Sequence, residues 1–130
     1  MSKCTLIVDD RDSVRRLLRH YVEIGTGCRN YGEAVDGVDA IEKASLLKPD
    51  LILMDLTMPN MNGIEAASAL KRMMPSVPII LFTMHDESLG RELISAACVD
   101  VVLSKPNGLR NLVACAQRFL QSAGNEGASR

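Results

Sequence analysis

Five polar residues in this sequence each follow a short apolar run, and their types suit phosphoryl chemistry. Asp9 and Asp10 follow one run, Asp55 a second, Thr83 a third, and Lys105 lies just past a fourth. Carboxylates that lie close together repel one another unless a cation shares their site, and a cluster of hard oxygen ligands suits Mg²⁺. Because Mg²⁺ keeps waters and bridges to phosphate oxygens, the expected chemistry is phosphoryl transfer.

Each of these residues would have its own role in that chemistry. Asp55 is the candidate nucleophile, since a carboxylate can form an acyl phosphate. Thr83 offers a hydroxyl donor for a phosphoryl oxygen, and Lys105 supplies a positive charge opposite the carboxylates. The sequence therefore predicts a phosphoacceptor site with a divalent metal.

The elements that must position these residues begin with five predicted strands. Four short apolar runs between turn residues predict buried strands. A fifth run of mixed residues predicts an edge strand, where one side meets solvent. The four buried runs are residues 5–8, 51–54, 77–82 and 99–103, and the edge run is 29–35.

Helical periodicity fills the segments between the strands. The clearest apolar stripe has i, i+3, i+4, i+7, i+8 spacing, and the arginines between its members are expected to face water: Val14, Leu17, Leu18, Tyr21 and Val22. Helices are also predicted near 37–47 and 63–73, with Asp36 and a capping box at Asn62 and Glu65 as start signals. A stripe of the same spacing at 109–120 and a shorter one at 89–96 predict two more helices. The alternation predicts an α/β fold, a doubly wound five-stranded parallel sheet flanked by five helices.

The bulk composition indicates an ordinary globular domain. The chain has 130 residues, 47% hydrophobic and 24% charged, which predicts one domain over 1–120 and a polar tail or linker start over 121–130. A net charge of -1 and the absence of a long apolar run give no reason to expect direct binding to nucleic acid or a membrane. The four cysteines have no metal-ligand spacing, so reduced thiols are expected. The first apolar run covers only residues 4–8, too short for a signal peptide or a membrane span, so a cytoplasmic location is expected.

Each site residue also has an ordinary structural interpretation. Asp9 and Asp10 could cap a helix, and Asp55 could be a turn residue. Thr83 could simply end a strand, and Lys105 could be a solvated loop lysine. Their joint placement at successive strand ends favours a site, because ligands of open parallel sheets bind beyond the carboxyl ends of the strands.

The chain resembles the response-regulator receiver domains (CheY-like) of two-component signalling over about residues 3–120. The resemblance depends on the acidic pair after the first strand, the segment 55–63, the threonine after an apolar strand and the Lys105-Pro106 pair. It implies a flavodoxin-like fold with strand order 2-1-3-4-5. It also implies a switch that a sensor histidine kinase or phosphotransfer protein phosphorylates on Asp55.

The resemblance further implies a role for each site residue. Asp10, Asp55 and the backbone carbonyl of Thr57 would bind Mg²⁺, with Asp9 assisting through water. Thr83 and Lys105 would hold the phosphoryl oxygens. Such a domain catalyses only its own phosphorylation and dephosphorylation. Its fourth helix, fifth strand and fifth helix would form the surface that controls a downstream protein or output domain.

In the family, four positions tune phosphorylation, dephosphorylation and the response to activation. Thr57 and His85 occupy the two variable positions that set the dephosphorylation rate, although His85 could also be a plain solvated histidine. Met84 stands where a small residue is usual, and Val102 where an aromatic ring usually turns inward. A β-branched valine has no comparable rotation. We therefore expect activation to move Thr83 and the loop after it without an aromatic reporter.

Three rival functions can be compared with this one. A haloacid-dehalogenase-like phosphatase needs a second Asp two residues after its nucleophile, where this chain has Thr57. A dinucleotide-binding domain needs GxGxxG after the first strand, where this chain has an acidic pair. A receiver-like scaffold that takes no phosphate is opposed by the presence of all five site residues. The sequence leaves open whether the domain stands alone or belongs to a longer regulator.

Overall fold

The computed structural model describes residues 3–55, 63–83, 101–104, 114 and 116–120, and it places five strands in one parallel sheet of order β2-β1-β3-β4-β5. Its elements are β1 (Cys4–Val8), α1 (Asp12–Thr26), β2 (Asn30–Ala34), α2 (Gly37–Leu47), β3 (Leu51–Asp55), α3 (Gly63–Met73), β4 (Ile79–Thr83) and β5 (Val101–Ser104). The predicted doubly wound α/β fold and the edge position of β2 are confirmed.

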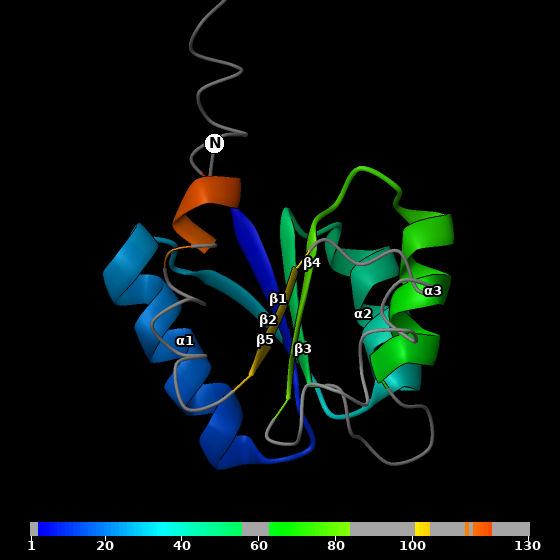
Figure 1. Cartoon of the computed structure of the whole chain (residues 1–130), viewed down its shortest axis with the longest axis horizontal. Coiled ribbons are helices and arrows are strands. Elements are labelled where there is room, and N and C mark those ends of the chain that lie inside the picture. Colours follow the sequence, from blue (N-terminus) through cyan, green and yellow to red (C-terminus); the bar gives the residue numbers. More distant parts are fainter. Residues whose placement is uncertain (1–2, 56–62, 84–100, 105–113, 115, 121–130) are drawn as a thin grey trace, which may run out of the picture.

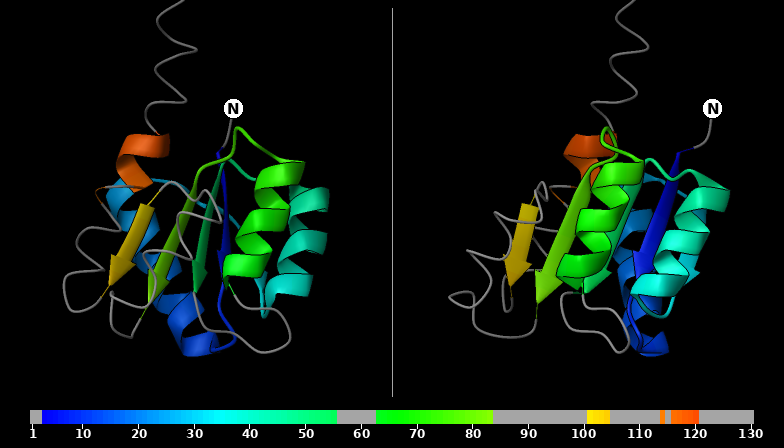
Figure 2. Two further views of the ribbon diagram at one scale, coloured as in Figure 1. Left: turned by 45° about the vertical axis from the view of Figure 1, so that its right-hand side comes forward. Right: turned by 90° about the vertical axis from the view of Figure 1, so that its right-hand side faces the viewer.

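Helices cover both faces of the sheet, as parallel strand connections require (Figure 1, Figure 2). One face is covered by α1 together with the helical residues 116–120. The other is covered by α2 and α3, with four alanines at the contact: Ala40, Ala44, Ala66 and Ala67. These small side chains let α2 and α3 lie close to the sheet. The strands β1 and β3 are buried along their whole length, which accounts for their nearly continuous apolar sequence.

Each face has its own hydrophobic core. The core under α2 and α3 contains Leu6, Val8, Ile52 and Met54, and the core under α1 contains Ile7, Leu51, Leu53 and Leu18 among others. Alternate residues of β1 and β3 thus point to opposite faces, as the period of two in a strand dictates. The two cores together hold the sheet rigid beneath its carboxyl edge.

Local signals set the helix boundaries. The Asp36 side chain accepts a hydrogen bond of 2.8 Å from the Asp39 backbone N–H, which confirms the predicted start of α2. At the C-terminal end of α1, Gly27 has φ 77° and its N–H bonds to the Glu23 carbonyl. This is a left-handed cap that glycine adopts without strain. The residue preceding α1 is Arg11, which makes no side-chain cap. The interpretation of Asp9 or Asp10 as a helix cap is therefore wrong.

The predicted apolar stripe of α1 is rotated from its expected position. Leu18 and Val22 are buried, whereas Leu17 and Tyr21 are 44% and 37% exposed. The buried face of the helix is centred on the Leu18 side, which leaves Leu17 on one margin and brings Arg15 in on the other. The Arg15 side chain is only 11% exposed. The expectation that all the arginines of this helix face water is wrong for Arg15.

Some predicted features lie outside the described residues. They include the helix expected at 89–96, the cap at Asn62, most of the stripe at 109–120, and two of the cysteines. Cys4 and Cys28 are described, and both are buried free thiols. In the described part of the chain, every helix is too short or too polar to span a bilayer.

Candidate functional site

The register of the sheet aligns the strand ends that carry the candidate residues. Val8 pairs with Met54, so the next residues, Asp9 and Asp55, are neighbours across β1 and β3. Asp55 in turn pairs with Phe82, directly before Thr83. The backbone thus brings the ends of β1, β3 and β4 together at one edge, as the sequence predicted.

Three carboxylates converge at this edge. One carboxylate oxygen from each of Asp9, Asp10 and Asp55 lies within 4.8 Å of the others. Asp9 is fully buried and Asp55 is 4% exposed, while Asp10 is exposed to solvent. Burying two carboxylates beside a third is costly unless a cation or hydrogen-bond donors compensate them. This cluster is typical of a site for a hard divalent metal.

Arg11 compensates part of that charge. Its Nε and Nη2 donate to the two carboxylate oxygens of Asp9 at 3.2 and 3.3 Å, and its backbone N–H donates to Asp9 Oδ1 at 2.8 Å. The same Nη2 lies 3.8 Å from Asp55 Oδ2. The hydrogen bond to Asp9 raises the pKa of Arg11 further above its ordinary value, and the negative charges of Asp9, Asp55 and Asp10 add to this effect. Arg11 therefore places one positive charge beside the carboxylates of the cluster.

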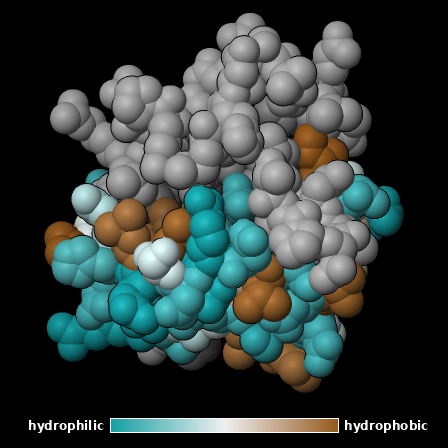
Figure 3. Space-filling view, turned by 90° about the horizontal axis from the view of Figure 1, so that it is seen from below, coloured by the Kyte–Doolittle hydropathy of each residue, from teal (hydrophilic) through white to brown (hydrophobic). Residues whose placement is uncertain are grey.

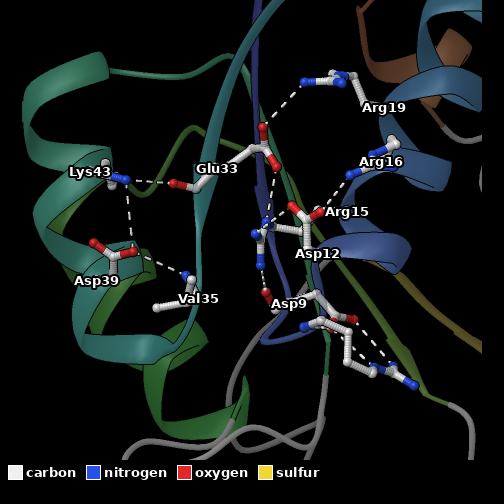
Figure 4. Close-up of polar contacts among 10 residues, drawn as sticks. Asp9, Asp12, Arg15, Arg16, Arg19, Glu33, Val35, Asp39 and Lys43 are labelled. Carbon is white, nitrogen blue, oxygen red and sulfur yellow. Dashed lines mark hydrogen bonds and ion pairs between the residues drawn. The ribbon is translucent and has the colours of Figure 1, made fainter.

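A second arginine holds the backbone of the cluster in place. Arg15 Nη1 donates to the Asp9 carbonyl at 2.7 Å, and its Nε donates to Glu33 Oε1 at 2.9 Å. Arg19 and Lys43 bond to the carboxylate and the carbonyl of Glu33 respectively (Figure 4). This network connects α1, β2 and α2 to the end of β1. It therefore holds the backbone of Asp9 in position.

Arg11 and Arg15 are not among the residues that the sequence predicted for the site. A signal was present, since Arg11 follows directly on an acidic pair and Arg15 lies one helical turn later. Their roles nevertheless depend on where the carboxylates and Glu33 come to lie, which local sequence does not state.

The other predicted site residues are placed less completely. Thr83 ends β4 and pairs with Ser104, while Val102 lies in β5 and pairs with Leu81. Thr57, Met84, His85 and Lys105 lie outside the described residues. Their roles remain predictions from the resemblance.

The surface around the strand ends is largely polar where it is described. Seen from this end of the molecule, hydrophilic side chains dominate and the apolar groups are scattered (Figure 3). Val35 and Val38 are 46% and 55% exposed and belong to the segment from β2 into α2. A polar surface suits a site that exchanges charged groups with solvent.

Comparison with known proteins identifies a family for this chain. The family described as "Response regulator receiver domain" matches residues 5–117. The chain is 38% identical to the chemotaxis protein CheY of Thermotoga maritima over 104 residues, which are 79% of this chain and 86% of that protein. It is 43% identical to the response regulator protein VraR of Staphylococcus saprophyticus over 82 residues, 63% of this chain and 39% of that protein.

Solved structures show the same likeness. A LuxR-family two-component response regulator from Aurantimonas sp. matches with a TM-score of 0.84 and 28% identity, over 94% of this chain and 87% of that one. Chemotaxis protein CheY4 of Vibrio cholerae matches with a TM-score of 0.80 and 26% identity, over 92% and 99%. This chain belongs to the response-regulator receiver domains of two-component signal transduction.

The relatives differ greatly in length. The chain spans 39% of VraR and 30% of a Thermotoga maritima protein-glutamate methylesterase with which it is 36% identical. The receiver fold is thus shared with longer proteins whose activities need not belong to this chain.

Proposed function

We propose that this chain is a phosphorylation-activated signalling switch whose phosphoacceptor is Asp55. The observation that carries the proposal is the position of Asp55, a nearly buried carboxylate at the end of β3 within 4.8 Å of two further carboxylates. In a receiver domain such a carboxylate is a candidate nucleophile. The expected donor is the phosphohistidine of a sensor histidine kinase or of a phosphotransfer protein.

The proposed reaction transfers one phosphoryl group. An oxygen of the Asp55 carboxylate attacks phosphorus, the N–P bond of the phosphohistidine breaks, and the imidazole leaves as the acyl phosphate forms. Attack of water on that phosphorus later releases inorganic phosphate and restores the carboxylate. Both reactions act on the domain itself, so it turns over no other substrate.

The acidic cluster fits a divalent cation, and Mg²⁺ is the proposed one. Asp10, Asp55 and the Thr57 carbonyl would hold it directly and Asp9 through water. The positively charged Arg11 among these acids supports the idea that the site needs a cation. Bound Mg²⁺ would neutralise charge that develops on the phosphoryl oxygens.

The remaining residues complete the proposed site. Thr83 and Lys105 would bind the phosphoryl oxygens, and Thr57 and His85 would set the lifetime of the acyl phosphate. Met84 would limit access to the site. Val102 would replace the aromatic residue that usually reports activation.

The proposed output is a change in the surface formed by the fourth helix, β5 and the fifth helix. That surface would control a downstream protein or an output domain. We expect residues 1–120 to form the receiver and 121–130 to be a tail or the start of a linker. The kinase would meet the domain in the cytoplasm, and direct contact with nucleic acid or membrane is not expected.

Phosphorylation with acetyl phosphate and Mg²⁺ tests the proposal. Intact-protein mass spectrometry should show one added phosphoryl group on the wild type and none on Asp55→Asn. Asp12→Asn is a matched control, because it removes an exposed carboxylate at the start of α1 that pairs with Arg15 and Arg16. It should be modified as the wild type is.

Two results would contradict the proposal. A wild type that gains no mass would favour a scaffold that works by contact alone. An Asp55→Asn variant that still gains the phosphoryl group would move the acceptor elsewhere. Many turnovers on a phosphomonoester would support the phosphatase alternative instead.

A further inference from the structure

The side chain of Arg11 lies against two of the three carboxylates to which the proposed function assigns a metal ion. Its guanidinium bonds to both oxygens of Asp9 and lies 3.8 Å from Asp55 Oδ2. Two of the three cluster carboxylates thus share one internal cation.

The neighbouring arginines are engaged differently. Arg15 binds Glu33, Asp12 and the backbone carbonyl of Asp9, and Arg19 binds Glu33. Arg16 binds the exposed carboxylate of Asp12 at 2.7 Å. Of these four arginines of the described chain, Arg11 is the one whose guanidinium contacts the carboxylates of the cluster.

We propose that Arg11 is an internal counter-ion that occupies the acidic cluster in the metal-free protein and competes with the divalent cation for it. The inference rests on the proposed function, because it assumes that the cluster binds Mg²⁺. Its consequence is regulatory, since the guanidinium must leave the carboxylates before they can coordinate a metal.

The contacts of Arg11 suit such a removable cation. Its side chain is 41% exposed, so it can turn toward solvent without opening the core. The separation of 3.8 Å from Asp55 is longer than a hydrogen bond, so little is lost there when the guanidinium moves. The backbone N–H of Arg11 still bonds to Asp9 Oδ1 and does not depend on the side chain.

Competition of this kind weakens metal binding in a predictable direction. When the binding-competent form is only a fraction of the population, the apparent dissociation constant rises by the inverse of that fraction. A half-exposed ion pair shifts such an equilibrium modestly, so we expect removal of the guanidinium to tighten Mg²⁺ binding roughly three- to fivefold. The domain would therefore need a several-fold higher Mg²⁺ concentration for half-saturation than it would need without the guanidinium.

Isothermal titration calorimetry of Mg²⁺ into the full chain tests the competition. Arg11→Met should lower the dissociation constant roughly three- to fivefold, because methionine keeps much of the side-chain length without the charge. Arg16→Met is the matched control, since it removes the same charge from the same helix but contacts only Asp12 among the acids named above. It should change the constant less than about twofold.

The outcomes separate this inference from the proposed function. Equal affinities of Arg11→Met and Arg16→Met would overturn the competition while leaving Mg²⁺ binding intact. Absence of Mg²⁺ binding in every variant, the wild type included, would overturn both proposals.

A measurement on the wild type covers the case in which Arg11→Met does not fold. The Nε–Hε resonance of Arg11 in a ¹⁵N correlation spectrum should shift as Mg²⁺ is added, in step with the backbone amides of Asp9 and Asp10. The corresponding resonance of Arg16 should stay in place. A stationary Arg11 resonance while those amides titrate would overturn the inference.

Discussion

Arg11 and Arg15 lie one helical turn apart, and the structure uses the same residue type in two different ways. Arg15 is 11% exposed and binds Glu33 and the Asp9 carbonyl, so its guanidinium is held by groups of β2 and the end of β1. Arg11 is 41% exposed and faces three carboxylates that outnumber it. Arg15 therefore stabilises the structure around Asp9, whereas Arg11 neutralises part of the negative charge of the acidic cluster.

The difference between the two arginines shows how the ratio of positive to negative side chains at the end of a sheet affects their roles. An arginine that is largely shielded from water and hydrogen-bonded to several groups is costly to remove, because those groups lose a charged donor. A half-exposed arginine beside excess carboxylates leaves a net negative charge that attracts another cation. The hydrogen-bond network around Asp9 and the acidic cluster thus take their positive charges from adjacent turns of one chain segment.

Removal of Arg15 should have the largest effect on stability. Arg15→Met is expected to lower the free energy of unfolding by about 2 kcal/mol, because the Asp9 carbonyl loses its charged donor and the Glu33 carboxylate keeps only Arg19 of its two arginines. Arg11→Met should cost less than about 1 kcal/mol in metal-free buffer, since its contacts are half-exposed. Urea unfolding followed by circular dichroism measures both. Equal losses would remove the distinction between the two arginines.

Coupling energies should sharpen the comparison at the level of single pairs. In a double-mutant cycle, Arg15→Met and Glu33→Gln should be coupled by about 1 kcal/mol, because the pair is partly shielded from water. The exposed pair Arg16 and Asp12 has side chains 70% and 65% exposed and should be coupled by only about 0.3 kcal/mol. Similar coupling in both cycles would mean that burial does not strengthen the Arg15 contact.

Ionic strength should give the smallest of these effects. At about 1 M salt the screening length falls to about 3 Å, so the contribution of the half-exposed Arg11 to stability should shrink by about 0.5 kcal/mol. The contribution of the buried Arg15 should change less. Repeating the urea unfolding of both Met variants in NaCl measures the difference. A larger salt effect at Arg15 would contradict the assigned exposures.

Local patterns predicted much of the fold. The helices at 37–47 and 63–73 have the predicted bounds, because their periodicity and, at Asp36, their cap are encoded within a few residues. The strands differ from prediction by one or two residues at their ends, where an apolar run and hydrogen-bond pairing need not coincide. Prediction failed at Leu17 and Arg15, because the rotation of a helix depends on the sheet beneath it.

The sequence by itself determined which acids could form the site, since Asp9, Asp10 and Asp55 directly follow apolar runs that must become parallel strands. The tertiary structure alone decided that their oxygens come within 4.8 Å of one another, because the pairing of Val8 with Met54 joins segments far apart in the chain. It also decided which of two arginines with similar sequence context, Arg11 rather than Arg15, contacts the carboxylates of the cluster. The partners of a long flexible side chain depend on which charges the folded sheet brings near it. In this chain the sheet places Asp9 and Asp55 within reach of Arg11.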